Sequence, residues 1–473
     1  LVTALCRIFI QDGIRVAPFK AQNMSLNSYV TREGGEMGRA QVVQAFAAKV
    51  DPDCRMNPVL LKPNSDTGSQ VIINGRPVGN MNVRQYHSYK QEAWKSVVKS
   101  YDELADAYEC IIMEGAGSPG EVNLKKHDFV NMKMARYAHS PVLLIGDIDR
   151  GGVYASFAGI MDVLEEWERK LIAGFVVNKF RGDFSLLDDA HTFMFDHTGR
   201  EVIGVIPYIT DLSVPQEDSV SFRDGFYGKE ATGSDQVEIV LVDLPHVSNF
   251  TDIDPLHYEP DVNIRVVDRG EDLGNPESVI IPGSKNVGGD LSFLKQNGFF
   301  NSLKKYAETG GVIVGICGGY QILGKTVSDP HHIETSIGMY EGLGILDIKT
   351  MLHPEKTLKK KSGVHIGSGH KVSGYEIHHG RSEGSAAPIL EFDDNSVCGS
   401  CNERGNVWGA YLHGVFDEDN FRRWFIDELR VKKGLTPKKK ICMPYNIDSS
   451  LDHLADVVRE CLDIEQMYRI LNL

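Results

Sequence analysis

The first half of the chain contains four short apolar runs, and each run ends in a cluster of polar residues or glycines. The runs begin near residues 16, 110, 141 and 175 and are separated by segments long enough to form helices. Continuous apolar runs of this kind are typical of strands that are buried on both faces. The pattern predicts a doubly wound α/β domain with a parallel sheet. In that architecture ligands bind beyond the carboxyl ends of the strands, where these polar clusters fall.

The second half carries the most distinctive local pattern, between residues 311 and 324. An apolar β-type run over 312–316 leads directly into Cys317, which is followed by Gly318, Gly319 and a short helix-compatible segment. Strand, tight turn, nucleophile and helix is the order found in a nucleophile elbow. Glycines permit the strained turn, and the N–H groups of the following helix can lower a thiol pKa and hold an oxyanion. The flanking glycines disfavour the plain alternative, a small buried cysteine that ends a strand.

A second segment, residues 407–417, ends a short predicted strand at His413. A thiolate needs a base that takes and returns its proton, and histidine titrates in the useful range. Together these residues resemble the class I, triad-type glutamine amidotransferase domain, over about residues 240 to 430, with Cys317 as nucleophile and His413 as base. Many relatives have a glutamate two residues after the histidine, whereas this chain has Val415. The resemblance therefore implies a Cys–His dyad and leaves open which group orients the imidazole.

The same resemblance implies an oxyanion hole beside Cys317. The loop over residues 281–286 occupies the place where such domains supply the second donor, so the backbone N–H groups of Gly283 and Gly318 are the candidates.

The expected domain division is a synthetase domain over 1–212, a linker over 213–236, an amidotransferase domain over 237–430 and a C-terminal helical tail over 431–473.

The first half resembles the P-loop synthetases of the dethiobiotin-synthetase type. Carboxylates at strand ends beside glycine-rich loops suit Mg²⁺ and nucleotide phosphates. The resemblance implies that Glu114 binds Mg²⁺, with Glu36 as a second candidate ligand, and that Lys20 contacts a phosphate. The residues expected near the nucleotide base or the substrate are Asn178, Lys179, Arg181 and Asp183.

The phosphate-loop motif Gly-x-x-x-x-Gly-Lys-Ser/Thr does not occur in this sequence. Residues 1–9 already show the apolar face of a helix, and in this fold the first strand and the phosphate loop precede that helix. We therefore expect a strand and loop of that kind ahead of Leu1. The alternative is a domain that has lost its phosphate loop and is inert.

Two further segments, residues 18–46 and 122–132, resemble the cobyric acid synthase family, and this resemblance extends over essentially the whole chain. It implies amidation of the b, d, e and g carboxylates of adenosylcobyrinic acid a,c-diamide to give adenosylcobyric acid. ATP, Mg²⁺ and L-glutamine would take part, through an acyl phosphate and ammonia released at Cys317. The alternatives are an a,c-diamide synthase-like or other glutamine-dependent ligase, and a non-catalytic P-loop-type switch or scaffold.

Composition sets limits on partners and location. At 473 residues the chain is too long for one ordinary core, which favours two domains and a tail. A net charge of −15 argues against nucleic acid or an anionic membrane as a partner. The partner that the family resemblance implies is a corrinoid small molecule. Eight scattered cysteines and the lack of a membrane-length apolar run favour the cytoplasm. The oligomeric state is not predicted.

Candidate cations for binding a polycarboxylate substrate are Arg32, Arg39, Arg84, Lys125 and Lys126. For each of them the alternative interpretation is a solvated charge on the surface.

Overall fold

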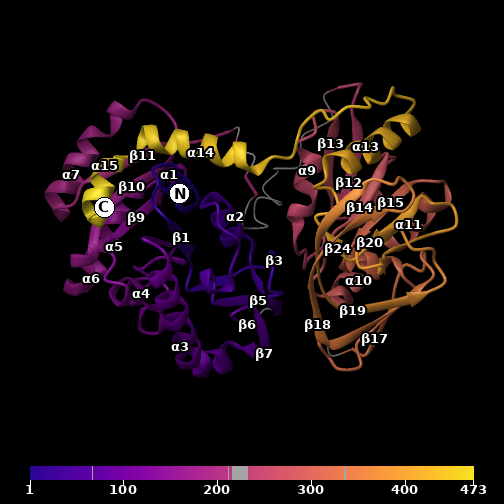
Figure 1. Cartoon of the computed structure of the whole chain (residues 1–473), viewed down its shortest axis with the longest axis horizontal. Helices are drawn as coiled ribbons and strands as arrows, with labels where there is room; N and C mark the ends of the chain where they lie inside the picture. Colours follow the sequence, from indigo (N-terminus) through magenta and orange to yellow (C-terminus); the bar gives the residue numbers. More distant parts are fainter. Residues whose placement is uncertain (66–67, 211, 213, 216–232, 335–336) are drawn as a thin grey trace.

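The computed structural model describes residues 1–65, 68–210, 212, 214–215, 233–334 and 337–473, and it shows two α/β domains side by side (Figure 1). The chain passes from the first domain to the second after residue 207 and then returns to the first domain at its C-terminal end. Most of the predicted linker, namely residues 213 and 216–232, lies outside the described residues.

The helices and strands of the first domain are α1 (Val2–Gln11), β1 (Val16–Phe19), β2 (Gln22–Met24), β3 (Ser28–Val30), β4 (Glu36–Gly38), α2 (Arg39–Ala47), β5 (Val59–Ser65), β6 (Gly68–Ile73), β7 (Arg76–Asn82), α3 (Val83–Ala107), β8 (Cys110–Met113), α4 (Met132–Tyr137), β9 (Val142–Asp147), α5 (Val153–Val163), α6 (Glu166–Leu171), β10 (Ile172–Phe180), α7 (Asp188–Thr198) and β11 (Val202–Pro207).

Those of the rest of the chain are β12 (Val237–Val242), α9 (Asp254–His257), β13 (Val262–Val267), β14 (Ser278–Ile281), α10 (Val287–Gln296), α11 (Phe299–Glu308), β15 (Val312–Ile316), α12 (Gly318–Leu323), β16 (Thr326–Ser328), β17 (Met339–Glu341), β18 (Ile348–His365), β19 (Lys371–Gly384), β20 (Leu390–Phe392), β21 (Val397–Cys398), β22 (Ser400–Cys401), β23 (Val407–Ala410), β24 (Leu412–His413), α13 (Asp419–Lys433), α14 (Ile447–Cys461) and α15 (Ile464–Leu471).

The four apolar runs of the first half form the predicted parallel strands β1, β8, β9 and β10. They belong to two sheets, however: β1 pairs with β8, while β9, β10 and β11 pair with one another. A cavity of about 420 Å³, lined mainly by apolar residues of α1, β8, β9 and α15, lies between β8 and β9. Ile145 on β9 borders this cavity and is 45% exposed, which is unusual for a parallel strand. The single continuous sheet that the sequence predicts is thus divided at this point.

The first domain also has an antiparallel part that the sequence does not predict. Strands β2, β5, β6 and β7 form a sheet, and β3 and β4 form a separate hairpin. In Figure 1, β3 and β5 lie on the side of the first domain that faces the second domain. This part of the first domain therefore supplies the contacts to the second.

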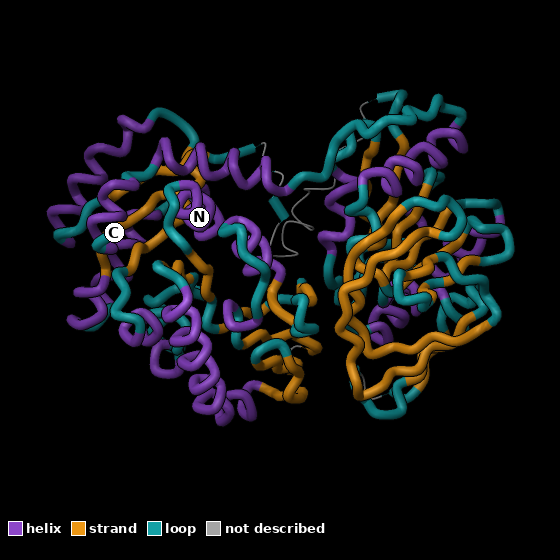
Figure 2. The backbone as a smooth tube through the Cα atoms, viewed as in Figure 1, coloured by secondary structure: helices purple, strands orange, loops and turns teal. Residues whose placement is uncertain are grey.

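The second domain is built on a sheet in the order β13-β12-β14-β15-β23-β22, in which β22 alone runs antiparallel to its neighbour. Its inner strands are rich in valine and isoleucine and are buried, as expected for strands covered on both faces. A second sheet contains the long antiparallel strands β18 and β19, which Figure 2 shows on the side toward the first domain. Strand β24 pairs with β19 and joins the two sheets near the end of β15.

The C-terminal segment returns to the first domain. Leu451 and Ala455 of α14 are fully buried against Ala4 and Ile8 of α1 in one apolar cluster. Arg459 adds an ion pair to Asp12, with 2.8 Å between Nη2 and Oδ1. The yellow helices over the first domain in Figure 1 are this segment. The sequence predicts a helical tail, and the structure shows that its last two helices are part of the core of the first domain.

We predict that Leu451→Ala destabilises the packing of α14 on α1 by about 2–5 kcal/mol, because a buried leucine is lost and a cavity remains. Hydrogen exchange of the α1 backbone amides measures this change locally. The control is His453→Ala, an exposed position on the same helix, which should change protection by less than about 0.5 kcal/mol. Equal protection of α1 in Leu451→Ala and wild type would contradict the proposed packing role.

Candidate active site

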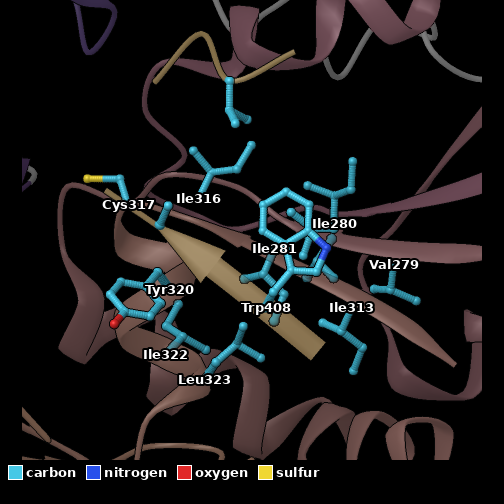
Figure 3. Packing of buried hydrophobic residues seen from close by; sticks show 14 of the residues in the cluster. Val279, Ile280, Ile281, Ile313, Ile316, Cys317, Tyr320, Ile322, Leu323 and Trp408 are labelled. Atoms are coloured by element: carbon cyan, nitrogen blue, oxygen red, sulfur yellow. The ribbon is translucent and has the colours of Figure 1, made fainter. Parts of the chain in front are cut away.

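Cys317 occupies the turn between β15 and α12 at the carboxyl edge of the second domain's sheet. Its backbone has φ 51° and ψ −103°, a region that costs about 1–3 kcal/mol for a residue with a side chain. Its N–H donates to the carbonyl of Ala410 at 2.8 Å, which fixes the turn against the end of β23. Figure 3 shows the sulfur at the margin of the apolar cluster, directed away from the packed isoleucine and leucine side chains. This is the geometry of the predicted nucleophile elbow.

His413 reaches the same place from β24. The strand pairs with β19 so that Tyr375 lies opposite His413, and the two rings stack with centroids 5.3 Å apart. His413 is 1% exposed, and its side chain makes a hydrogen bond with that of Cys317. Residues 96 positions apart in sequence are therefore joined, as the sequence predicts.

Asp252 orients the histidine. His413 Nδ1 lies 2.7 Å from Asp252 Oδ2, and the other carboxylate oxygen accepts the N–H of Gly414 at 2.8 Å. A proton on Nδ1 donates to the carboxylate, so Nε2 is left for exchange with the nucleophile and the substrate. The sequence predicts a dyad and leaves the orienting group open. The structure places Asp252 in that role.

The electrostatic surroundings favour a protonated imidazole. Burial disfavours the charged form, but the Asp252 carboxylate and the Cys317 side chain outweigh it and raise the pKa of His413 to about 10. A histidinium held beside a cysteine stabilises the thiolate, which is the nucleophilic form. The arrangement is therefore suited to attack by Cys317 on a carboxamide carbon.

The sequence gives little signal for Asp252. It lies 161 residues before His413, in a 3₁₀ turn (Phe250–Ile253) of the connection between β12 and α9. The position two residues after the histidine, where the family resemblance led us to look for a carboxylate, is Val415. The one local hint is that polar residues follow the buried strand β12, as they do in the other parallel strands.

The two candidate oxyanion donors lie on segments that touch each other. A Cβ placed on Gly318 would lie 2.6 Å from the backbone nitrogen of Ser284, and one on Gly283 would lie 3.2 Å from His413 Cε1. Neither position can take a side chain without displacing the elbow or the histidine. Because Gly318 begins α12, its N–H has no acceptor within the helix. The roles of Gly283 and Gly318 as oxyanion donors remain predictions, and this close approach is consistent with them.

Lys20 and Glu114 meet at the carboxyl ends of the paired strands β1 and β8. Lys20 Nζ lies 2.7 Å from Glu114 Oε1, and Gln44 donates to the other oxygen of Glu114. The glycine-rich loop after β8 starts at Gly115, and Glu114 lies at the polar end of the cavity between β8 and β9. An ammonium beside a carboxylate fits a phosphate oxygen and a hydrated Mg²⁺. The residues present therefore fit the nucleotide and metal assignments, which remain predictions.

Glu36 does not fit its predicted role as a metal ligand. Its carboxylate is fully buried between Lys62 Nζ at 2.9 Å and Lys356 Nζ at 2.6 Å. Burial would raise the pKa of Glu36, but the two ammonium groups hold it far below its usual range. Two cations around one carboxylate repel a third, so we do not retain Glu36 as a ligand of Mg²⁺.

The predicted base-binding or substrate-binding residues gather at the ends of β9 and β10. Lys179 pairs with Asp147 at 2.9 Å, and Arg181 pairs with Asp149 at 3.3 Å while lying over the ring of Tyr208. Two neighbours, Asn178 at the end of β10 and Asp183 at the start of a 3₁₀ turn, complete this cluster. Proximity supports a common site, and their contact with a base or substrate stays a prediction.

The candidate cations for the substrate have different surroundings. Arg39 is buried with its guanidinium over the ring of Tyr29, whereas Arg32 is exposed and pairs with Asp51. Lys125 pairs with Glu168. The remaining two, Arg84 and Lys126, are exposed. Their role in substrate binding remains a prediction.

Among the helices of the described residues, none combines the length and the apolar character needed to cross a membrane.

Comparison with known families divides the chain at the same place as the fold. A model of the CobQ/CobB/MinD/ParA nucleotide binding domain matches residues 1–221, and one of the CobB/CobQ-like glutamine amidotransferase domain matches residues 238–421. A cobyric acid synthase of Nitratidesulfovibrio vulgaris is 49% identical and aligns with 100% of this chain and 95% of its own length. One of Moorella thermoacetica is 46% identical, with 100% and 94% covered.

Among solved structures, PurLQS from Thermotoga maritima aligns with 47% of this chain and 99% of its own at 17% identity. The TM-score is 0.31.

We predict that Asp252→Asn lowers kcat/KM for glutamine hydrolysis about 100-fold or more, because the imidazole loses its orienting charge. Burial still disfavours the imidazolium in this variant, so the pKa of His413 should fall from about 10. The alkaline limb of the pH–rate profile should then move to lower pH. The control is Asp268→Asn, an exposed position in the same domain. An unshifted alkaline limb in Asp252→Asn would contradict the assignment.

Proposed function

The chain belongs to the cobyric acid synthase family, and we propose that it amidates the b, d, e and g carboxylates of adenosylcobyrinic acid a,c-diamide to give adenosylcobyric acid. Membership of this family makes it a C–N ligase with glutamine as amido donor. The observation that supports the proposal best is the buried Cys317–His413–Asp252 arrangement. It is a complete set of groups for glutamine hydrolysis in the same chain as a nucleotide-binding domain.

The amidotransferase domain supplies ammonia. The Cys317 thiolate attacks the carboxamide carbon of glutamine, and the N–H groups of Gly283 and Gly318 stabilise the oxyanion that forms. His413 gives its proton to the leaving nitrogen, and the carbon–nitrogen bond breaks to release ammonia and leave a thioester. Water, deprotonated by His413, then hydrolyses the thioester to glutamate and regenerates Cys317.

The synthetase domain must activate the acceptor, because a carboxylate has no leaving group that ammonia can displace. ATP bound with Mg²⁺ supplies the phosphoryl group that converts the carboxylate to an acyl phosphate. Lys20 would neutralise charge on the phosphate oxygens, and Glu114 would hold Mg²⁺, which would offset the negative charge of the phosphates. Ammonia then attacks the acyl carbon, and phosphate leaves.

The loop beside Cys317 makes a buried contact with the first domain. Lys285, on the loop next to Cys317, is 8% exposed and donates to Gln70 of the first domain at 3.3 Å. Ammonia that escaped into water would be protonated and lost as a nucleophile. A buried contact between the loop at Cys317 and the first domain favours direct transfer across this interface.

Two alternatives to the proposed function differ from it in the products that they would form or in forming none. An a,c-diamide synthase-like ligase would add two amides, whereas the proposed enzyme adds four, so mass spectrometry of the corrinoid product distinguishes them by counting exchanges of –OH for –NH₂. A non-catalytic switch or scaffold would hydrolyse no glutamine. The intact Cys317–His413–Asp252 arrangement disfavours that second alternative.

We predict that Cys317→Ala abolishes glutamine-dependent amidation and leaves amidation with high added ammonia, because the synthetase site is separate. Product formation is measured with each nitrogen source in parallel. The matched control is Cys401→Ala, a cysteine of the same domain on β22. If a folded Cys317→Ala enzyme lost both activities, the proposed division of labour between the domains would be wrong.

We predict that His413→Ala reduces glutamine hydrolysis by about 10³-fold or more, because the nucleophile and base act as a unit. Alkylation of Cys317 by an electrophilic glutamine analogue should slow in parallel, since the thiolate loses its counter-ion. The substitution Val415→Glu, at the position where many relatives have glutamate, should not increase the rate, because Asp252 already binds Nδ1. A wild-type rate in His413→Ala would rule out its role as base.

A further inference from the structure

The β3–β4 hairpin of the first domain contacts the turn that carries Asp252. The backbone N–H of Ser28 on β3 donates to Asn249 Oδ1 in the second domain at 2.9 Å, and both residues are buried. Asn249 begins the 3₁₀ turn that contains Asp252 and has φ 53°. A group of the first domain therefore fixes the first residue of the turn that orients His413.

Ser28 is itself held by charged groups. Its hydroxyl donates to Glu36 Oε1 at 2.9 Å and accepts from Lys62 at 2.8 Å. The other oxygen of Glu36 accepts from Lys356 on β18 of the second domain at 2.6 Å. A continuous buried network thus leaves the second domain at Lys356, passes through the hairpin, and returns to it at Asn249.

The same hairpin also supports the other face of His413. Val30 packs in a small buried apolar cluster with Tyr375 and Ile377, and the rings of Tyr29 and Tyr375 lie 4.9 Å apart. Tyr375 in turn stacks on the His413 ring. The hairpin is therefore next to both supports of the imidazole, the stacked tyrosine and the turn with the aspartate.

Loss of one member of this network is costly because the others stay buried. Glu36 is 0% exposed, Lys62 4% and Ser28 0%, so an unpaired partner cannot recover its hydration without opening the interface. The network consequently has one favourable arrangement, with the two domains docked and Asn249 bound to Ser28.

We propose that the β3–β4 hairpin of the synthetase domain positions the Asp252–His413 pair, with Ser28 and Asn249 as positioning residues, so that glutamine hydrolysis depends on the docked first domain. The proposal rests on the glutaminase role of Cys317 proposed above. It couples ammonia release to the presence of the domain that consumes ammonia. The coupling acts through the domain contact, which holds the Asp252–His413 pair in its working position.

Two substitutions of Asn249 separate the hydrogen bond from the backbone conformation. Asn249→Gly keeps the positive φ and removes the acceptor, whereas Asn249→Asp keeps both an oxygen acceptor and tolerance of that φ. We expect Asn249→Gly to lower kcat for glutamine hydrolysis ~10-fold or more with KM within about twofold, since small misplacements of a catalytic group have effects of this size. Asn249→Asp should restore kcat to within about threefold of wild type.

Glu36→Gln tests the network from its other end, remote from the turn. It should lower kcat in the same direction with KM little changed. The matched control is Glu355→Gln, next to Lys356 but 85% exposed at its side chain and in a surface pair with Arg381 at 3.5 Å, which should behave as wild type. Thermal unfolding of each variant is recorded. If Asn249→Gly does not fold, the kcat of Glu36→Gln tests the positioning role in its place.

The outcomes are distinct. If wild type releases no glutamate and Cys317 resists the electrophilic glutamine analogue, the proposed function fails. If wild type is active and Asn249→Gly and Glu36→Gln match it in kcat, the positioning role is overturned while the proposed function stands. A purely structural role, which also overturns the proposal, would lower the melting temperature and raise KM as much as it lowers kcat, with no recovery in Asn249→Asp.

Discussion

The hydrogen bond between His413 and Asp252 is the interaction on which the proposed chemistry of this protein depends. Burial to 1% exposure disfavours the charged form of the imidazole. The carboxylate reverses that preference and also selects which ring nitrogen faces the nucleophile. The oriented imidazole of His413 thus has a fixed position beside the strained turn at Cys317 and the loop of Gly283.

Charged side chains buried between the domains constrain how the two domains dock. Glu36 with Lys62 and Lys356 forms a cluster that spans the interface and would be poorly solvated if the domains separated only slightly. Such a cluster contributes little net stability, but it penalises wrong arrangements strongly. It therefore defines how the first domain sits on the loop beside Cys317, where Lys285 also contacts Gln70. The proposed transfer of ammonia from one site to the other requires such specific docking.

In the first domain, the parallel pairing of strands determines which polar side chains meet at the edge of a sheet. Lys20 and Glu114 lie together because β1 and β8 pair in parallel and end at the same edge. Asp147 and Lys179 lie together for the same reason on β9 and β10. Of these four residues, Glu114 lines the cavity between β8 and β9. Helix α15 lines part of the same cavity, and α14 packs against the first helix, α1.

The sequence by itself determined the local features: the buried parallel strands, the elbow at Cys317, a strand-end histidine at 413, and the resemblance that named the family. These follow from short-range patterns, since apolar runs report burial and glycines report a tight turn. Tertiary structure alone decided the partners. Asp252 was assigned to His413 across 161 residues, Glu36 was given to two lysines rather than to a metal, the predicted single sheet was divided, and the last helices were packed on α1. A sequence pattern states that a group is buried or at a strand end, but which group it meets is determined by the long-range pairing of strands and the docking of domains.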